Sequence, residues 1–322
     1  MTDSPILAIS ARAAQLRRQG VDVITLAAGE PDTPTAAPIV AAAAAALERP
    51  DYHHYGPGQG LPELRATIAV QLTGILDLPY TADDIVITLG AKHALFLALH
   101  AICRTGDRVL VASPGWPGHH GAIAAVGGTS VHVPAAAEDN FLLDPRALER
   151  AWEPDTRALI LASPANPTGS VYDADRPAAI AEWAEKREVW IISDDIYRSF
   201  AYDREHVPLL AVAPGAREHT IVVDGVSKAH AMTGWRVGWL AAPPTVVGAA
   251  TTHIGQTVTN VPQFTQVAAH NAIADPRPVA VTAAIYRNRR NRIHKALNQL
   301  PGVQCPLRPT AACSSSHPSA TC

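Results

Sequence analysis

The sequence of 322 residues lacks several features that mark particular classes of protein. Its four cysteines do not have the spacing of metal ligands, so neither a zinc site nor a disulfide framework is indicated. A net charge of −3, without a basic cluster interleaved with aromatic residues, argues against a nucleic-acid partner. No apolar run is long enough to span a membrane and no signal pattern opens the chain, so we expect a cytoplasmic protein without a membrane partner.

Nucleotide and metal motifs are also missing. The glycines of "GPGQG" at residues 56–60 have the wrong spacing for a dinucleotide loop, and no Walker A motif occurs. The pairs His53–His54 and His119–His120 have no carboxylate or cysteine at helical spacing, and adjacent histidines do not readily bind one ion together. We therefore expect no metal and interpret these histidines as polar rim residues.

Short apolar runs alternate with segments of helical periodicity, which predicts an α/β fold with a mainly parallel sheet flanked by helices. Ligands in such sheets bind at the carboxyl ends of the strands, where the loops here carry Gly90, Asn166, Asp194 and Lys228. We therefore expect the site at that edge. The expected strands are residues 84–89, 108–113, 129–134, 157–163, 188–193, 219–225 and 236–242.

The sequence predicts a large domain with a smaller companion. Residues 1–45 are expected to form an N-terminal arm and a small-domain segment, with a helix that Gly20 ends. Residues 46–280 would form the large domain. A basic amphipathic helix from residue 275 to about 300 would lead into residues 281–322, the start of a small α/β domain that is incomplete.

Lysine is scarce, and one lysine stands in an unusual place. The chain has only Lys92, Lys186, Lys228 and Lys295 against 22 arginines. Lys228 lies within "VDGVSKAHAMTGWRVGW", among small, hydroxyl and aromatic residues. An arginine cannot deprotonate, whereas a desolvated lysine amine can lose its proton and attack a carbonyl. The alternative is a lysine that only extends its charged end to solvent from a buried strand.

An isolated buried lysine suits a cofactor that carries an aldehyde. Pyridoxal phosphate (PLP) needs an amine for a Schiff base, a carboxylate for its pyridinium nitrogen, and donors for its phenolic oxygen. It also needs an aromatic ring over the pyridine, and cations with helix N-terminal amides for its phosphate. The sequence offers a candidate for each requirement.

Seven motifs then occur in one order. "SPANPTG" (163–169), "SDDIY" (193–197) and "SKAHAMTGWRVGW" (227–239) follow "AAGEPD", "YGPGQGLPELR", "GAKHAL" and "SPGW". In this order and spacing the chain resembles the class I/II, fold-type I PLP-dependent aminotransferases of the aspartate aminotransferase type. The resemblance covers roughly residues 24–300 and implies transamination between an amino acid and a 2-oxo acid.

The resemblance assigns the catalytic centre residue by residue. Lys228 would form the Schiff base and move the proton, and Asp194 would keep the pyridinium nitrogen protonated. Asn166 and Tyr197 would donate to the phenolic oxygen, and Trp116 would stack on the ring. Their alternatives are ordinary: a turn asparagine, a core tyrosine and a tryptophan that covers a core edge. For Asp194 the alternative is a helix N-cap, a role that we expect of its neighbour Asp195 instead.

The phosphate would be held by the loop that enters a helix at Gly90, Ala91 and Lys92. Ser227 would add a hydroxyl and Arg236 a fixed charge. The family often has a hydroxyl residue where Lys92 stands, so only the backbone amide of Lys92 is assigned to the phosphate.

Two further residues are implied for binding. Tyr55 resembles the tyrosine that reaches the phosphate from a neighbouring subunit, which implies a homodimer with shared sites; its alternative is an exposed turn aromatic. Gly29 resembles a glycine near the substrate carboxylate, and Trp116 and Asn166 would also contact substrate. The same constellation serves carbon–sulfur lyases, so a lyase or an inactive relative stays open.

The C-terminal segment departs from the family. Family members continue into a small-domain strand and later supply an arginine for the substrate α-carboxylate. Here residues 306–322, "PLRPTAACSSSHPSATC", have neither strand alternation nor helical period. We interpret this tail as aberrant and hypothesise a truncated or frameshifted aminotransferase with low activity.

Overall fold

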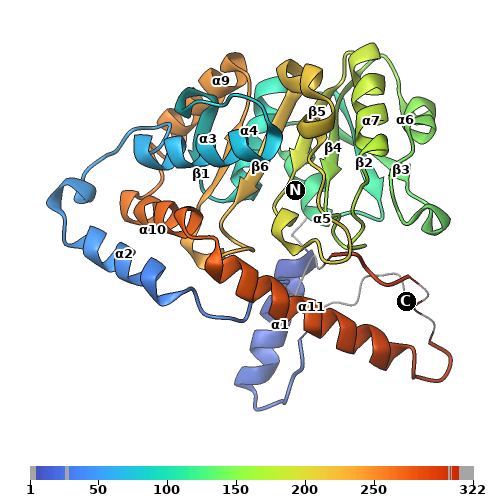
Figure 1. Ribbon diagram of the computed structural model, residues 1–322, viewed down its shortest axis with the longest axis horizontal. Helices are drawn as coiled ribbons and strands as arrows, with labels where there is room; N and C mark the ends of the chain where they lie inside the picture. The colour runs from blue at the N-terminus through green and yellow to red at the C-terminus, as the bar shows by residue number, and fades with distance from the viewer. Residues whose placement is uncertain (1–4, 26–28, 304, 306, 312–322) are drawn as a thin grey trace.

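The computed structural model describes residues 5–25, 29–303, 305 and 307–311. Its centre is a seven-stranded sheet with the order β1-β7-β6-β5-β4-β2-β3 (Figure 1). All seven expected strands are present, each within two residues of its predicted bounds. They are β1 (Ile85–Thr88), β2 (Arg108–Ser113), β3 (Thr129–Pro134), β4 (Thr156–Ala162), β5 (Trp190–Asp194), β6 (Thr220–Gly225) and β7 (Gly238–Ala241).

The strand directions confirm a mainly parallel sheet. Pairing is parallel from β3 through β2, β4 and β5 to β6, and only β7 runs antiparallel to both of its neighbours, β1 and β6. Thr88, at the end of β1, and Gly225, at the end of β6, both pair with Gly238, at the start of β7. The chain entering β7 therefore lies at the same edge as the carboxyl ends of the other strands.

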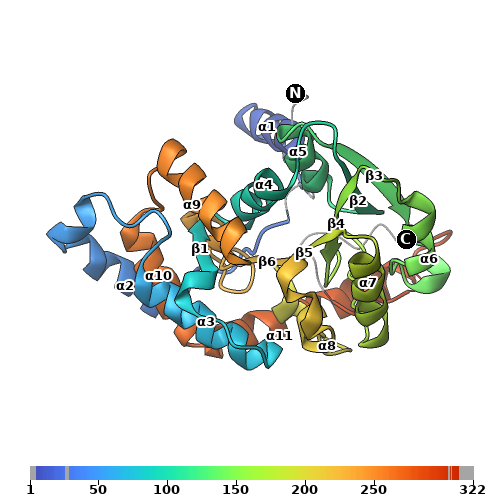
Figure 2. The same ribbon diagram turned by 90° about the horizontal axis from the view of Figure 1, so that it is seen from above.

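Helices cover both faces of the sheet (Figure 2). One face packs against α4, α5 and α9, and the other against α3, α6, α7 and α8. These helices are α3 (Pro62–Leu76), α4 (Ala91–Ile102), α5 (Pro117–Ala125), α6 (Pro145–Ala151), α7 (Asp175–Lys186), α8 (Leu209–Val212) and α9 (Pro244–Thr257). The apolar side chains of α4 and α7 recur at helical spacing and face the sheet, which agrees with the predicted alternation of strands and helices.

The remaining helices lie toward the chain ends. They are α1 (Pro5–Arg18), α2 (Ala37–Leu47), α10 (Gln263–Ala274) and α11 (Arg277–Leu297). The alanine run at residues 41–46 has a structural role that its composition did not reveal. It forms most of α2, whose buried face includes Ala43 and Ala46 and packs on α10 (Figure 1).

Helix α11 is joined by hydrogen bonds to two distant segments of the chain. The Tyr286 hydroxyl donates to the Asp32 carboxylate at 3.0 Å, and its ring packs edge-on against Phe200. The Arg290 guanidinium donates to both carboxylate oxygens of Asp203. The division into a large and a small domain stays a prediction, because these contacts join α11 to both the residue-32 segment and the sheet domain.

Part of the predicted aberrant tail has a defined place. Ala311 forms a β-bridge with Ala201, and the Ala311 amide donates to the Gly169 carbonyl at 2.9 Å. A Cβ on Gly169 would lie 2.6 Å from the Ala311 carbonyl oxygen and 2.7 Å from Pro309. Residues 307–311 therefore pack beside the "NPTG" loop, whereas residues 312–322, on which the frameshift hypothesis depends, lie outside the described residues.

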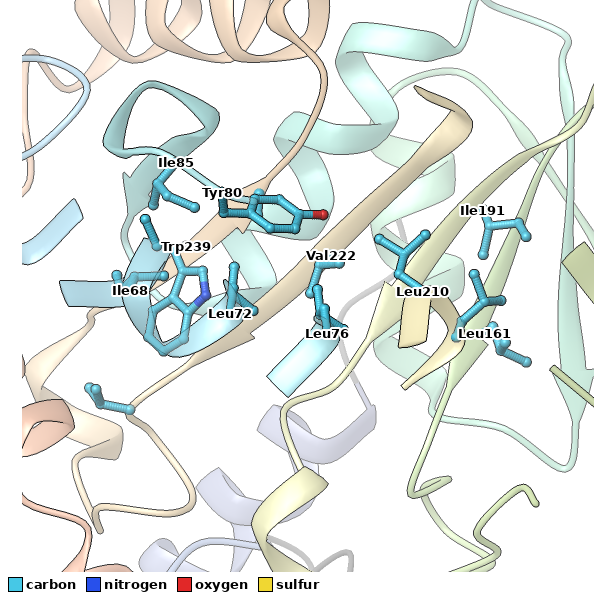
Figure 3. Close-up of a cluster of buried hydrophobic side chains, with 14 of the residues drawn as sticks. Ile68, Leu72, Leu76, Tyr80, Ile85, Leu161, Ile191, Leu210, Val222 and Trp239 are labelled. Carbon is cyan, nitrogen blue, oxygen red and sulfur yellow. The ribbon is translucent and has the colours of Figure 1, made fainter. Parts of the chain in front are cut away.

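The largest buried cluster lies between α3 and the sheet (Figure 3). Ile68 and Leu72 of α3 point toward Trp239 of β7 and Ile85 of β1. The sequence "PELRATIAVQLTGIL" forms this helix with proline in its first turn, and its apolar residues recur at intervals of three and four.

We expect Ile68→Ala to lower the free energy of unfolding by about 2–5 kcal/mol, because it leaves a cavity at a fully buried position. Val70→Ala on the same helix is the matched control, since Val70 is 75% exposed, and it should change stability by less than about 0.5 kcal/mol. Chemical denaturation of both variants measures this difference. Equal losses would contradict the packing of α3.

Candidate active site

Lys228 lies three residues beyond β6, at the carboxyl edge of the sheet, and its side chain is partly buried. Its Nζ donates to the Gly29 carbonyl oxygen at 2.6 Å. Burial lowers the pKa of the Lys228 amine; Arg236 and Lys92 lower it further, while the Glu30 carboxylate acts in the opposite direction. This arrangement increases the neutral, nucleophilic fraction of the amine, and it does not fit a lysine that simply reaches solvent.

Tyr197 and Asn166 flank the lysine. The Lys228 Nζ lies 5.9 Å from the centroid of the Tyr197 ring. The Asn166 side-chain amide donates to the Tyr197 hydroxyl at 3.4 Å, across the loops that follow β4 and β5. The tyrosine is buried, and its ring also packs with Phe200 and Tyr286. Two hydrogen-bonding groups from different loops thus meet beside one amine.

Asp194 is the last residue of β5 and is buried. Its carboxylate lies 3.2 Å from Nε2 of His119, which is also buried. The His119 ring stands edge-on to Trp116, with ring centroids 5.2 Å apart, and the Lys92 Nζ lies 5.2 Å from the Trp116 ring centroid. A continuous series of contacts therefore joins the end of β5 to the starts of α5 and α4.

The loop after β1 leads directly into the start of α4. Gly90, with φ of 83°, precedes α4, whose first backbone N–H groups have no partner within the helix. The Arg236 guanidinium donates to the Leu89 carbonyl at 3.0 Å, and a Cβ on Gly90 would lie 2.5 Å from its Nη2. A Cβ on Gly238 would lie 2.4 Å from the Ala91 nitrogen. Close backbone approach and a fixed charge therefore meet at a helix N-terminus, which suits a phosphate.

The structure places the other predicted site residues less uniformly. Ser227 is buried directly before Lys228. The Gly29 carbonyl accepts the hydrogen bond from Lys228, and its predicted place near the substrate carboxylate stays a prediction. Tyr55 is 87% exposed, and no described residue links it to Lys228, so its predicted role across a dimer stays a prediction.

Two interpretations from the sequence are wrong. His119 is not a rim residue: it is buried against Asp194 and Trp116, although its neighbour His120 and the surface residue His53 fit the rim description better. The only sequence signal was its position three residues after Trp116, which is one helical turn.

Asp195 does not cap a helix with its side chain. Its carboxylate is buried and accepts a hydrogen bond from the Ser193 hydroxyl at 2.8 Å. Burial raises the pKa of Asp195 to about 6, against the opposing effects of Ser193 and Arg198, and Asp194 raises it slightly further. Among the described residues, no group of three or more histidine, cysteine, aspartate or glutamate side chains could hold a metal ion.

The comparisons with known proteins agree with this geometry. The model of the family described as "Aminotransferase class I and II" matches residues 21–321. The chain belongs to this family. It is 39% identical to an aspartate aminotransferase of Streptomyces avermitilis over 308 residues. The match covers 95% of this chain and 76% of that protein.

Other aminotransferases are similar in sequence and in structure. The aspartate/prephenate aminotransferase of Thermus thermophilus is 37% identical over 316 residues, with 97% of this chain and 80% of that protein covered. A solved structure of Thermus thermophilus aspartate aminotransferase with maleate has a TM-score of 0.92 at 36% identity, and it covers 97% of this chain and 81% of that one. The chain is thus an aminotransferase with the predicted fold. None of its described helices is both long and apolar enough to cross a membrane.

We expect Asp195→Asn to be at least as stable as the unchanged protein at about pH 7.5. The folded-state pKa of about 6 exceeds the ordinary value of 3.8, so above it the folded protein carries a buried charge that the amide lacks. The advantage, up to about 2–3 kcal/mol, should shrink as the pH falls from about 7 to about 4, because the carboxyl group then becomes neutral. Urea denaturation across this range measures it; a difference independent of pH would contradict the raised pKa.

Proposed function

We propose that this aminotransferase uses PLP to transfer an amino group between an amino acid and a 2-oxo acid. The observation that carries the proposal is the buried Lys228 amine with its lowered pKa, set beside Tyr197 and Asn166. A lowered pKa increases the neutral fraction of the amine at a given pH, and the neutral amine can attack an aldehyde and later exchange a proton with a substrate carbon.

The donor set fits PLP. The helix-start amides of Ala91 and Lys92, with Arg236 against Gly90, would hold the phosphate, and the Ser227 hydroxyl would add a donor. Gly90 and Gly238 leave room for close approach because a Cβ at either position would collide with its neighbours.

The ring would be held by other residues. Asp194 would sit opposite the pyridinium nitrogen, and the buried His119 would fix the orientation of that carboxylate at 3.2 Å. Asn166 and Tyr197 would donate to the phenolic oxygen, and Trp116 would cover the ring.

When bound, PLP supplies an aldehyde and a ring that accepts the electron pair left at the substrate α-carbon. Lys228 would donate and accept the proton at that carbon. The Asp194 carboxylate would keep the ring nitrogen protonated, and Gly29, Trp116 and Asn166 would orient the substrate.

The names of the relatives support an acidic amino acid as the donor to test first. Proteins 33–39% identical to this chain are called aspartate or aspartate/prephenate aminotransferases. Lys92 adds a cation near the amine that would attract a second carboxylate. We also propose a homodimer in the cytoplasm, in which Tyr55 reaches the partner's site.

Lys228→Ala should lower amino-group transfer from aspartate to 2-oxoglutarate by roughly a thousandfold or more, because one amine supplies both the covalent link and the proton transfer. Lys228→Arg should be nearly as damaging, since guanidinium does not deprotonate. Lys186→Ala, at an exposed position on α7, is the control and should be unchanged.

Coupled assay of the 2-oxo acid product measures these rates, and borohydride reduction followed by peptide mapping identifies the attached lysine. Attachment at any other lysine would overturn the assignment. Release of pyruvate and ammonia without an amino acceptor would indicate a lyase. No turnover by the protein without substitutions would indicate an inactive relative.

A further inference from the structure

A buried ion pair lies directly beneath the active-site residues. Nε of Arg198 donates to the Asp224 carboxylate at 2.7 Å, and Nη2 donates to the side-chain oxygen of Gln71 on α3 at 2.8 Å. Only 21% of the arginine side chain and 5% of the aspartate side chain are exposed. The Asp224 carboxylate also accepts from the Gly225 amide, so its position on β6 is fixed by the backbone.

The pair joins the two chain segments that carry the reactive groups. Arg198 directly follows Tyr197, and Asp224 precedes Lys228 by four residues. The bond between them therefore ties the turn after β5 to the end of β6, while Gln71 ties the same guanidinium to a helix outside the sheet.

Other titratable groups surround this pair. Asp195 lies close enough to affect both partners electrostatically, and it raises the pKa of Arg198 and of Asp224. Burial raises the pKa of Asp224 to about 6, against the lowering effect of Arg198. His206 and His230 also face the guanidinium, and burial lowers the pKa of each to about 4, so both are neutral near pH 7.

Stability alone does not account for such a pair. Desolvation of two charges consumes most of their attraction, and neutral side chains of similar volume are often as stable. The pair instead fixes the orientation of the Arg198 side chain, because Asp224 and Gln71 both bind its planar guanidinium.

We propose that Arg198 and Asp224 are positioning residues that set the distance between Tyr197 and the Lys228 amine. The proposal rests on the proposed function for its catalytic consequence, but not for its effect on the environment of Lys228. Without the pair, the Tyr197 turn is free to move away from β6, and the amine gains access to water.

The test replaces both charges together in the full chain, as Arg198→Met with Asp224→Asn, so that neither member of the pair is left buried without the other. Arg176→Met with Asp139→Asn is the matched control. Arg176, in the first turn of α7, donates to both oxygens of Asp139 in the turn after β3, and the two side chains are 25% and 42% exposed.

The first readout needs no cofactor. The pH dependence of Lys228 labelling by an amine-specific reagent, followed by peptide mass spectrometry, reports the pKa of the amine in the PLP-free protein. We expect the double variant at residues 198 and 224 to shift this pKa upward toward its ordinary value, and the control to leave it unchanged.

The second readout is kinetic. With PLP, kcat should fall about tenfold, about 1.4 kcal/mol, while KM changes less than about twofold, because alignment is lost and binding is retained. Arg198→Lys with Asp224 intact should recover part of kcat. An unchanged labelling profile and unchanged kcat in the double variant would overturn the proposal.

If the double variant does not fold while the control does, the variant Gln71→Met tests the proposal. This change frees one side of the guanidinium without leaving a buried charge unpaired, and it should shift the Lys228 profile in the same direction by less. No shift would overturn the proposal. Absence of amino-group transfer by the protein without substitutions would refute the proposed function. The Lys228 labelling profiles would still test whether Arg198 and Asp224 position the amine.

Discussion

The hydrogen-bonded order of five strands is the constraint on which the rest of the molecule depends. β5 lies between β4 and β6, and β7 lies antiparallel between β6 and β1. This order brings Asn166, Asp194, Lys228 and Gly90 to one edge from loops far apart in sequence. The single reversed strand adds Arg236, because the chain approaches Gly238 from that edge. A different order of these strands would separate the Lys228 amine from Asp194 and Arg236.

Burial of charge at this edge then creates the chemistry. The same low-dielectric surroundings lower the pKa of the Lys228 amine and raise the pKa of Asp195. Lys228 and Asp194 lie at this edge, and the Arg198–Asp224 pair ties the turn after β5 to β6. A reactive lysine and a fixed ion pair are therefore consequences of one desolvated edge.

Much of the fold could be predicted from local sequence. The seven strands and α4 were predictable because short apolar runs and helical spacing reflect the faces that each element buries. The side-chain partners were not. His119 was misassigned because nothing near it in sequence reveals that β5 ends beside α5. Asp195 was misassigned because an aspartate directly after a strand can either cap a helix or be buried, and its residue type fits both.

The sequence by itself determined the family and the order of the motifs, and it singled out Lys228 as the predicted Schiff-base lysine. These depend on residue type and spacing, which are local properties of the chain. Only the tertiary structure decided how buried that lysine is, which acid faces His119, and that Arg198 reaches Asp224 across 26 residues. The physical reason is that desolvation and ion pairing depend on distances through space, and strand pairing sets these distances between segments that no local pattern connects.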